Sequence, residues 1–292
     1  MIAADTAPVI AGVDGGASGR DALVLGSWAA DVLDVPLVVA VVHPEPAGGA
    51  GRIDAEWIAD RHRAAEAVLE GARTVLKDAT GPVEYRAVAS TSASHGLHDL
   101  AEELGAQAIV VGSGRSAPPM RLFAGSTAER LLAGSSCPIA VAPAGMSTPP
   151  GSVGRIGVAY IDTPDGRAAL DTAAALAART GSPLRLYTVV TDQDSALPPL
   201  IGEDSERAFL SLARETYEGA LEAAVATVQD ADADFEILTG NVVDTLSELD
   251  DVDVLFCGSR GYGPARRVLL GGVSTKLMRR AKRPIVVVPR SG

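Results

Sequence analysis

Short apolar runs alternate with longer amphipathic segments along the chain. Runs such as 36–42 and 108–111 are apolar at every position, which is typical of strands covered by helices on both faces. The predicted strands of the first half are 8–13, 36–42, 83–89, 107–112 and 138–143, with helices at 18–34, 54–79, 94–104 and 125–134. The second half has predicted strands at 154–160, 183–190, 232–238, 253–258 and 284–289. This alternation favours an α/β fold in which each half forms a doubly wound, mostly parallel sheet.

The two halves are related by an internal repeat. Glycines 13 positions apart recur after a displacement of 146 residues, first as Gly112 with Gly125 and then as Gly258 with Gly271. The run Pro-Ile-Ala-Val-Ala-Pro at 138–143 returns as Pro-Ile-Val-Val-Val-Pro at 284–289. The Pro-Pro-Gly-Ser stretch between the halves is typical of a linker. We therefore predict a first domain at 1–145, a linker at 146–154 and a second domain at 155–292.

The composition is that of a folded globular protein. Of 292 residues, 47% are hydrophobic and 21% charged, so the chain can bury a sizeable core. The net charge of −12 argues against general binding of nucleic acids or anionic membranes. No segment has the roughly 20 apolar residues that a membrane-spanning helix needs. Two cysteines, Cys137 and Cys257, make no disulfide framework. We expect a cytoplasmic protein that contacts neither nucleic acid nor membrane.

The end of the 253–258 strand carries a pattern suited to binding phosphate. The strand runs into Gly258 and Gly261, and nine residues later the sequence Gly271-Gly272-Val273-Ser274-Thr275 stands where a helix should begin. Glycines let the main chain approach an anion, and a helix start offers unpaired N–H groups, with Ser274 as a further donor. In an open parallel sheet, ligands bind at the carboxyl ends of the strands. The sequence thus predicts a phosphate cradle that lacks a Walker lysine.

Basic residues gather around this second-half loop. Residues 257–290 contain nine basic side chains and no acidic one, whereas 111–144 contain three basic and one acidic. On this count the second half is the better polyphosphate site. The alternative is that these side chains form a solvated face paired with acids elsewhere.

The spacing Gly-x2-Gly-x9-Gly, followed by a small hydroxyl residue and repeated in the first half with Arg115 at its second position, resembles that of the tandem universal stress proteins, in their ATP-binding branch. The resemblance covers nearly all of both halves. It implies a five-stranded Rossmann-like sheet of the adenine-nucleotide alpha-hydrolase type in each half. It also implies a role in stress adaptation or growth regulation and a homodimer of the tandem chain.

The resemblance implies ATP contacts in both halves, with departures in each. Asp14 matches the nucleoside-binding aspartate, whereas the second half has Ile161 there and Asp162 one place late. In the first phosphate loop Arg115 replaces the second glycine, and in the second loop Gly272 replaces a hydroxyl residue. The predicted binding residues are Asp14, Val41, Gly112, Gly125, Ser126, Val189, Gly258, Gly261, Gly271, Gly272, Val273 and Ser274.

We expect ATP, with Mg²⁺ recruited by its phosphates, at one of these sites at least. The chain has no P-loop lysine, no Gly-x-Ser-x-Gly elbow and no His-Glu metal motif, so no dedicated catalysis is expected. The leading hypothesis is a nucleotide-responsive module that acts on an unidentified protein partner. A nucleotide-independent, chaperone-like stress protein is the alternative, and a slow ATPase is the third.

Three other patterns favour ordinary structural roles. Residues 112–117 match a dinucleotide-binding pattern, but Pro118 and Pro119 follow where a helix is required. His95 and His98 share a helix face without a third ligand, which favours capping or surface positions over a metal site. Cys257 follows a buried run, which favours a packed thiol over a nucleophile.

Overall fold

The computed structural model describes residues 7–45, 52–114, 117, 119–122, 125–132, 134–146, 153–191, 203–259 and 272–289; of 52–55 and 203–213 it describes the backbone only. The chain divides into two compact units, Met1–Gly151 (unit 1) and Ser152–Gly292 (unit 2). The predicted linker bounds of 146–154 stay a prediction.

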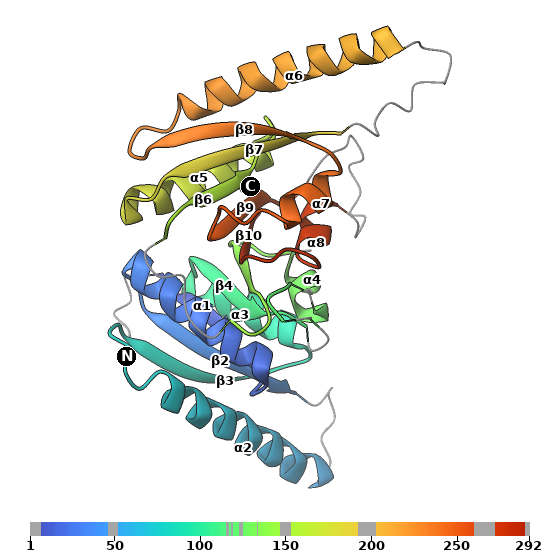
Figure 1. Cartoon of the computed structure of the whole chain (residues 1–292). Helices are drawn as coiled ribbons and strands as arrows, with labels where there is room; N and C mark the ends of the chain where they lie inside the picture. The colour runs from blue at the N-terminus through green and yellow to red at the C-terminus, as the bar shows by residue number, and fades with distance from the viewer. Residues whose placement is uncertain are drawn as a thin grey trace. The chain divides into compact units, whose positions relative to one another are not determined.

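Unit 1 alternates strands and helices as the hydrophobic pattern predicts (Figure 1). Its elements are β1 (Val9–Gly12), α1 (Ala17–Leu33), β2 (Leu37–Pro44), α2 (Arg52–Val75), β3 (Val83–Ser90), α3 (Ala93–Leu104), β4 (Ala108–Gly112), α4 (Ser126–Leu132) and β5 (Ile139–Ala142). Each predicted strand and helix of this half is confirmed, with bounds that differ by a few residues at most.

The unit 1 sheet is parallel and has the strand order β3-β2-β1-β4-β5. In β1, Val9 pairs with Leu37 of β2 on one side and with Ala108 of β4 on the other. The chain therefore builds the sheet outward from β1 in one direction and then returns to build it in the other. The carboxyl ends of β1 and β4 form the point at which the strand order reverses, which is where such sheets bind ligands.

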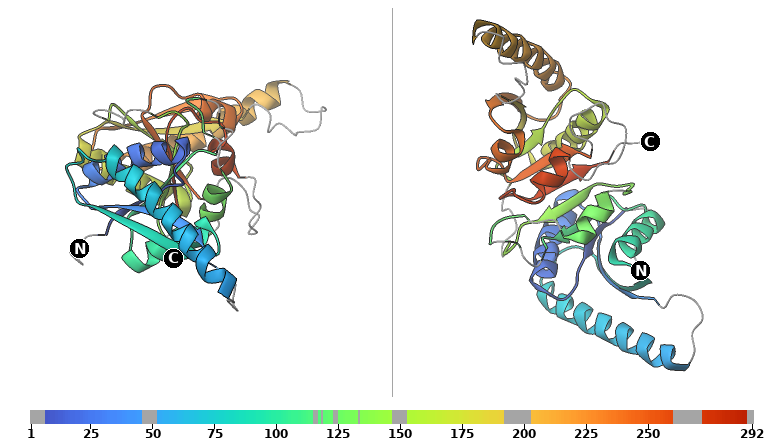
Figure 2. Two further views of the ribbon diagram at one scale, coloured as in Figure 1. Left: turned by 90° about the horizontal axis from the view of Figure 1, so that it is seen from below. Right: turned by 90° about the vertical axis from the view of Figure 1, so that its right-hand side faces the viewer.

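Helices cover both faces of this sheet (Figures 1 and 2). Helix α1 packs on β1 and β4, and α2 packs on β2 and β3. Helices α3 and α4 contact each other, as expected if right-handed crossovers bring both to the opposite face. The central strands are apolar on both faces, and Ile10, Val39 and Val110 have no exposed surface. Burial of these side chains on both faces explains why the strands read as continuous apolar runs.

Unit 2 repeats the same arrangement. Its elements are β6 (Ile156–Ala159), α5 (Pro164–Thr180), β7 (Leu184–Val190), α6 (Glu203–Val225), β8 (Ala233–Thr239), α7 (Val242–Ser247), β9 (Val254–Gly258), α8 (Val273–Leu277) and β10 (Ile285–Val288). The strand order β10-β9-β6-β7-β8 matches that of unit 1, and the strand pairs are again parallel. The prediction of two tandem, doubly wound, parallel α/β repeats is confirmed.

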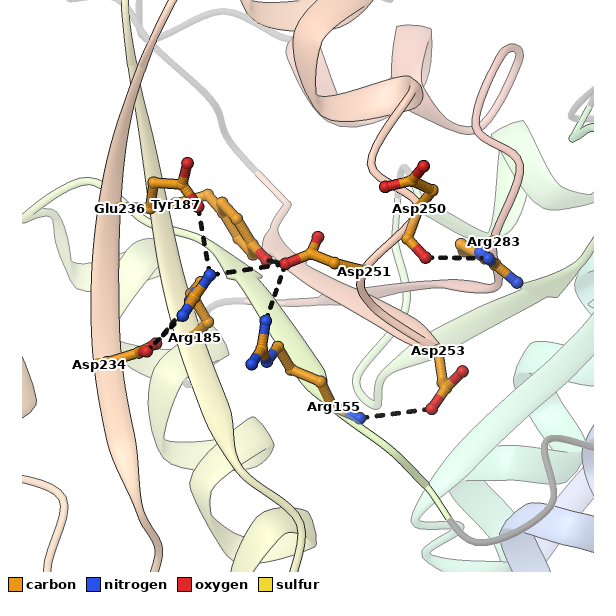
Figure 3. A network of polar contacts seen from close by, with 9 residues as sticks. All are labelled: Arg155, Arg185, Tyr187, Asp234, Glu236, Asp250, Asp251, Asp253 and Arg283. Atoms are coloured by element: carbon orange, nitrogen blue, oxygen red, sulfur yellow. Dashed lines mark hydrogen bonds and ion pairs between the residues drawn. The ribbon is translucent and has the colours of Figure 1, made fainter.

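A polar network ties the strands of unit 2 together at their amino-terminal ends (Figure 3). Arg185 of β7 donates from Nε to Asp234 of β8 at 2.7 Å. Asp251, just before β9, accepts hydrogen bonds from Arg155 Nη1 at 2.9 Å and from the Tyr187 hydroxyl at 2.7 Å. Because these groups lie at the amino-terminal edge, they stabilise the sheet at the end opposite to its carboxyl edge, where parallel sheets usually bind ligands.

Candidate functional site

A cavity of about 300 Å³ lies at the carboxyl ends of β1, β2 and β4 in unit 1. This is the edge at which the strand order reverses. The sheet contributes Gly12, Ala40 to Pro44 and Val111 to the wall, and α2 and α3 contribute mainly apolar side chains, among them Val68 and Leu97. A volume of this size is at the lower end of the range for pockets that hold a small molecule.

The cavity brings together three residues that were predicted from the sequence. Asp14, Val41 and Gly112 come from three different strand ends, and all of them line it. The exposed Asp14 carboxylate is oriented by its own loop, because Oδ1 accepts a hydrogen bond from the Gly16 N–H at 2.9 Å. Val41 is almost fully buried and is an apolar part of the cavity wall.

Gly112 is required by the packing of α1, whatever occupies the cavity. A Cβ at this position would lie 1.9 Å from the Ser18 carbonyl oxygen. The same close contact between helix and strand occurs in unit 2, where a Cβ on Gly258 would lie 2.7 Å from the Asp165 carbonyl oxygen. The sequence prediction explained these glycines by close approach to an anion. The structure supplies a different reason, a close contact between a helix and a strand that is repeated in both units.

The second part of the first phosphate loop lies at the start of α4. A Cβ on Gly125 would be 3.4 Å from the Gly114 Cα, so the two arms of the loop approach each other. Ser126 is the first residue of α4, but Thr127 is the hydroxyl residue that lines the cavity. Arg115 lies outside the described residues.

In unit 2, part of the predicted phosphate loop lies outside the described residues, including Gly261 and Gly271. Gly272 is the N-cap of α8 and Val273 its first residue. Ser274 is 4% exposed, and its hydroxyl donates to the Ser259 carbonyl oxygen at 3.3 Å. The predicted donor to phosphate is therefore used within the protein.

The nucleoside end of unit 2 differs from that of unit 1. The pairing of β6 with β7 repeats the pairing of β1 with β2, with each residue 147 positions later in the chain. The counterpart of Val41 is therefore Thr188, and the predicted Val189 stands one place later. The Thr188 hydroxyl donates to the Tyr160 carbonyl oxygen at 2.7 Å. At the counterpart of Asp14 stands Ile161, and the neighbouring Asp162 forms an ion pair with Arg167. Burial and the Asp162 charge raise the pKa of Tyr160 to about 12.

Unit 2 also places a carboxylate where unit 1 has a hydroxyl. Ser18, opposite Gly112, lines the unit 1 cavity. The residue opposite Gly258 is Asp165, which is 7% exposed and accepts a hydrogen bond from the Ser259 hydroxyl at 3.1 Å. A carboxylate at this point repels a phosphate group.

Two basic side chains in the described part of the unit 2 basic run are paired with acids, and a third is bonded to the main chain. Arg280 forms an ion pair with Asp244, and Lys282 with Glu248. Arg283 donates to the Asp250 carbonyl oxygen at 3.0 Å. For these side chains the alternative interpretation of the run holds, and their charge does not favour a phosphate in unit 2. Arg260, Arg266, Arg267 and Arg290 lie outside the described residues.

Four polar or charged residues that line the cavity were not predicted: Ser18, His43, Arg61 and Thr127. Periodicity could have found Arg61, because Arg61, Ala65 and Val68 are three to four positions apart and share one face of α2. Thr127 stands directly after a predicted residue. For Ser18 and His43 the sequence carries no signal that distinguishes them from other polar residues at the ends of elements.

Other candidates take the structural roles that the sequence favoured. Ser92 caps α3 by accepting the His95 N–H, and His98 pairs with Glu102 at 3.2 Å. Cys137 and Cys257 are buried, and burial raises the pKa of the Cys257 thiol to about 12, which makes it a poor nucleophile.

Comparison with known proteins decides the family. The model of the universal stress protein family matches residues 6–143 and again residues 153–289. The chain belongs to the universal stress protein family. Universal stress proteins from Mycobacterium tuberculosis and Mycobacterium bovis are each 30% identical to it over 293 residues, which cover 96% of this chain and 99% of the relative. The relatives thus span the same tandem length.

Solved structures agree with this fold. A universal stress protein from Archaeoglobus fulgidus has a TM-score of 0.67 at 20% identity and covers 97% of this chain and 96% of its own. A protein from Pseudomonas aeruginosa has a TM-score of 0.62 at 14% identity, with 99% and 95% covered. Among the described residues of this universal stress protein, every helix is too short or too polar to cross a membrane.

Proposed function

We propose that unit 1 of this tandem universal stress protein binds an adenine nucleotide, ATP, and acts as a regulatory module without a dedicated reaction. The observation that carries the proposal is the cavity at the strand-order reversal that Asp14, Val41 and Gly112 line together. These three positions are the ones that the family resemblance assigns to nucleoside, base and phosphate.

The chemistry of the wall fits such a ligand. Ala40, Val41 and Leu97 offer an apolar surface for a base, and the Asp14 carboxylate can accept hydrogen bonds from ribose hydroxyls. The Thr127 hydroxyl can donate to a phosphate, and adjacent phosphates commonly recruit Mg²⁺. Under this proposal bound nucleotide biases a surface that an unidentified protein partner reads, and the tandem chain forms a homodimer.

Unit 1 is preferred over unit 2 on three contrasts. Asp14 and Ser18 of unit 1 are replaced by Ile161 and the buried Asp165 in unit 2. The Ser274 hydroxyl of unit 2 is already bonded to the Ser259 carbonyl oxygen, whereas Thr127 of unit 1 lines the cavity. These differences reverse the preference drawn from counting basic residues.

Titration calorimetry of the full chain with Mg-ATP tests the proposal. We expect one nucleotide per chain, and an affinity about tenfold lower for Asp14→Ala, because hydrogen bonds from the ribose to a charged group are worth about 1.5 kcal/mol or more. Asp162→Ala is the matched control in unit 2 and should bind like the wild type. Absence of binding at millimolar ATP would instead support the nucleotide-independent, chaperone-like protein.

The same preparation separates binding from catalysis. We expect no sustained phosphate release beyond a slow background, since no described residue has been identified as a general base for hydrolysis. Rapid turnover that disappears on changing one acid or base would support an ATPase.

A further inference from the structure

Two histidines face each other at the rim of the unit 1 cavity. His43, near the end of β2, lines the cavity and is 8% exposed. His62 comes from α2, and its Nδ1 lies 3.5 Å from Nε2 of His43. The rings meet edge to face with centroids 5.4 Å apart.

The remaining nitrogen of each ring faces an acceptor. His43 Nδ1 lies 3.4 Å from the Pro44 carbonyl oxygen, and His62 Nε2 lies 3.9 Å from Glu66 Oε1. Both contacts are longer than the usual 2.7–3.2 Å of a hydrogen bond, but an oxygen that can only accept still favours the ring proton on the nitrogen that faces it, which is His43 Nδ1 in one ring and His62 Nε2 in the other. The two facing nitrogens are then both lone pairs. Such an arrangement calls for a cation between them.

The separation of the facing nitrogens suits a metal ion better than a shared proton. At 3.5 Å the pair is beyond the 2.7–3.2 Å typical of hydrogen bonds from N–H groups. Two nitrogen ligands at about 2.0–2.1 Å from a tetrahedral Zn²⁺ lie about 3.3–3.4 Å apart. Histidines that bind metals also usually have a carboxylate or carbonyl oxygen next to the ring nitrogen that does not bind the metal.

We propose that His43 and His62 bind a divalent transition-metal ion, with Zn²⁺ as the representative ion, at the rim of the unit 1 cavity. The site goes beyond the proposed nucleotide site and does not depend on it. The described residues contain no cluster of three or more His, Cys, Asp or Glu side chains arranged to hold a metal. The site is therefore an open one, with positions left for water or for a small molecule in the cavity.

Charged side chains of both signs lie near the histidine pair. Arg61 and Asp14 line the same cavity, and Arg61 is also drawn toward the Trp57 ring, with Cζ 5.6 Å from its centroid. Glu66 supplies a negative charge behind His62. Because only two protein ligands hold the ion, we expect micromolar rather than nanomolar affinity.

Calorimetric titration of the full chain with ZnCl₂, after chelator treatment and without nucleotide, tests the proposal. We expect one Zn²⁺ per chain, with affinity reduced more than tenfold in His62→Gln, a side chain exposed enough for the substitution to leave the fold intact. His98→Gln is the matched control, because His98 also pairs with a glutamate four residues on, on α3. It should bind like the wild type.

Electron paramagnetic resonance with Cu²⁺ as the probe gives a second readout. Hyperfine coupling to two imidazole nitrogens is expected in the wild type and to one in His62→Gln. Glu66→Gln should weaken Zn²⁺ binding about tenfold by removing the outer carboxylate. Absence of Zn²⁺ binding would show that the pair holds only a proton, and equal affinity in the wild type and His62→Gln would place the ion elsewhere; either result would overturn the proposal. Neither depends on whether ATP binds.

Discussion

The main chain of α1 lies so close to Gly112 that no side chain fits between them. The same contact occurs at Gly258 against α5, although the residues opposite the two glycines differ. A glycine in a phosphate-binding pattern can thus serve two purposes at once. Of these two purposes, anion binding and helix packing, the structure directly supports the second, the packing of the first helix of each unit against its sheet.

Gly112→Ala should lower the free energy of unfolding by about 1–3 kcal/mol, because the added Cβ overlaps the Ser18 carbonyl and forces α1 away from β4. Urea denaturation measures the change. Gly71→Ala is the matched control: a Cβ on this α2 residue meets no atom within 4 Å, so alanine should stabilise the helix by about 0.5–1 kcal/mol. A Gly112→Ala protein as stable as the wild type would contradict the packing interpretation.

At the scale of elements, strands and helices followed from the hydrophobic pattern because each central strand is buried on both faces. The register of the paired strands did not follow from this pattern, because register depends on contacts between segments that are distant in the sequence. The sequence prediction placed Val189 as the counterpart of Val41, one residue too late, because the pairing of β6 with β7 aligns Thr188 with Val41. The network around Arg185 was likewise hidden, because its members come from separate strands and loops.

The hydrogen bond between Arg185 and Asp234 should make the free energy of unfolding depend on pH. The hydrogen bond from Arg185 lowers the pKa of Asp234 below its ordinary 3.8, so the contact stabilises the fold above that pH and is lost as pH falls through the lowered pKa. Arg185→Met should reduce the free energy of unfolding by about 1 kcal/mol at neutral pH, since a charged, forked pair joins β7 to β8. The difference from wild type should shrink in strong acid.

Urea titrations at neutral and strongly acidic pH measure this difference. Arg63→Met is the control: Arg63 pairs with Asp60 on the exposed face of α2, and such surface pairs contribute about 0–1 kcal/mol. An equal loss for both variants, or a loss for Arg185→Met that does not change with pH, would show that the strand-joining pair has no special role.

At the scale of the whole molecule, the repeat predicted two copies of one fold but not their divergence in the candidate site. Counting basic residues favoured unit 2, because a sequence does not show that Arg280 and Lys282 are paired with acids. It also does not show that Asp165 is buried beside Ser259. Asp14, Val41 and Gly112 were found because they follow strands, and strand ends meet at one edge. Ser18 and His43 reach the cavity through tertiary packing that no local pattern encodes.

If unit 1 alone holds nucleotide, ligand should stabilise the two units unequally. Binding to the folded state raises stability by RT ln(1 + [L]/Kd), about 2.7 kcal/mol at one hundred times Kd, and this gain should be confined to the unit that binds. Hydrogen exchange of the full chain with and without Mg-ATP measures it amide by amide. Slower exchange is expected at the ends of β1, β2 and β4 and at the start of α4, with little change at β6, β7 and β9. Asp14→Ala should remove most of the protection, whereas Asp162→Ala should retain it. Equal protection in both units would show that the buried Asp165 carboxylate does not exclude phosphate, and protection in unit 2 alone would restore the preference drawn from its basic residues.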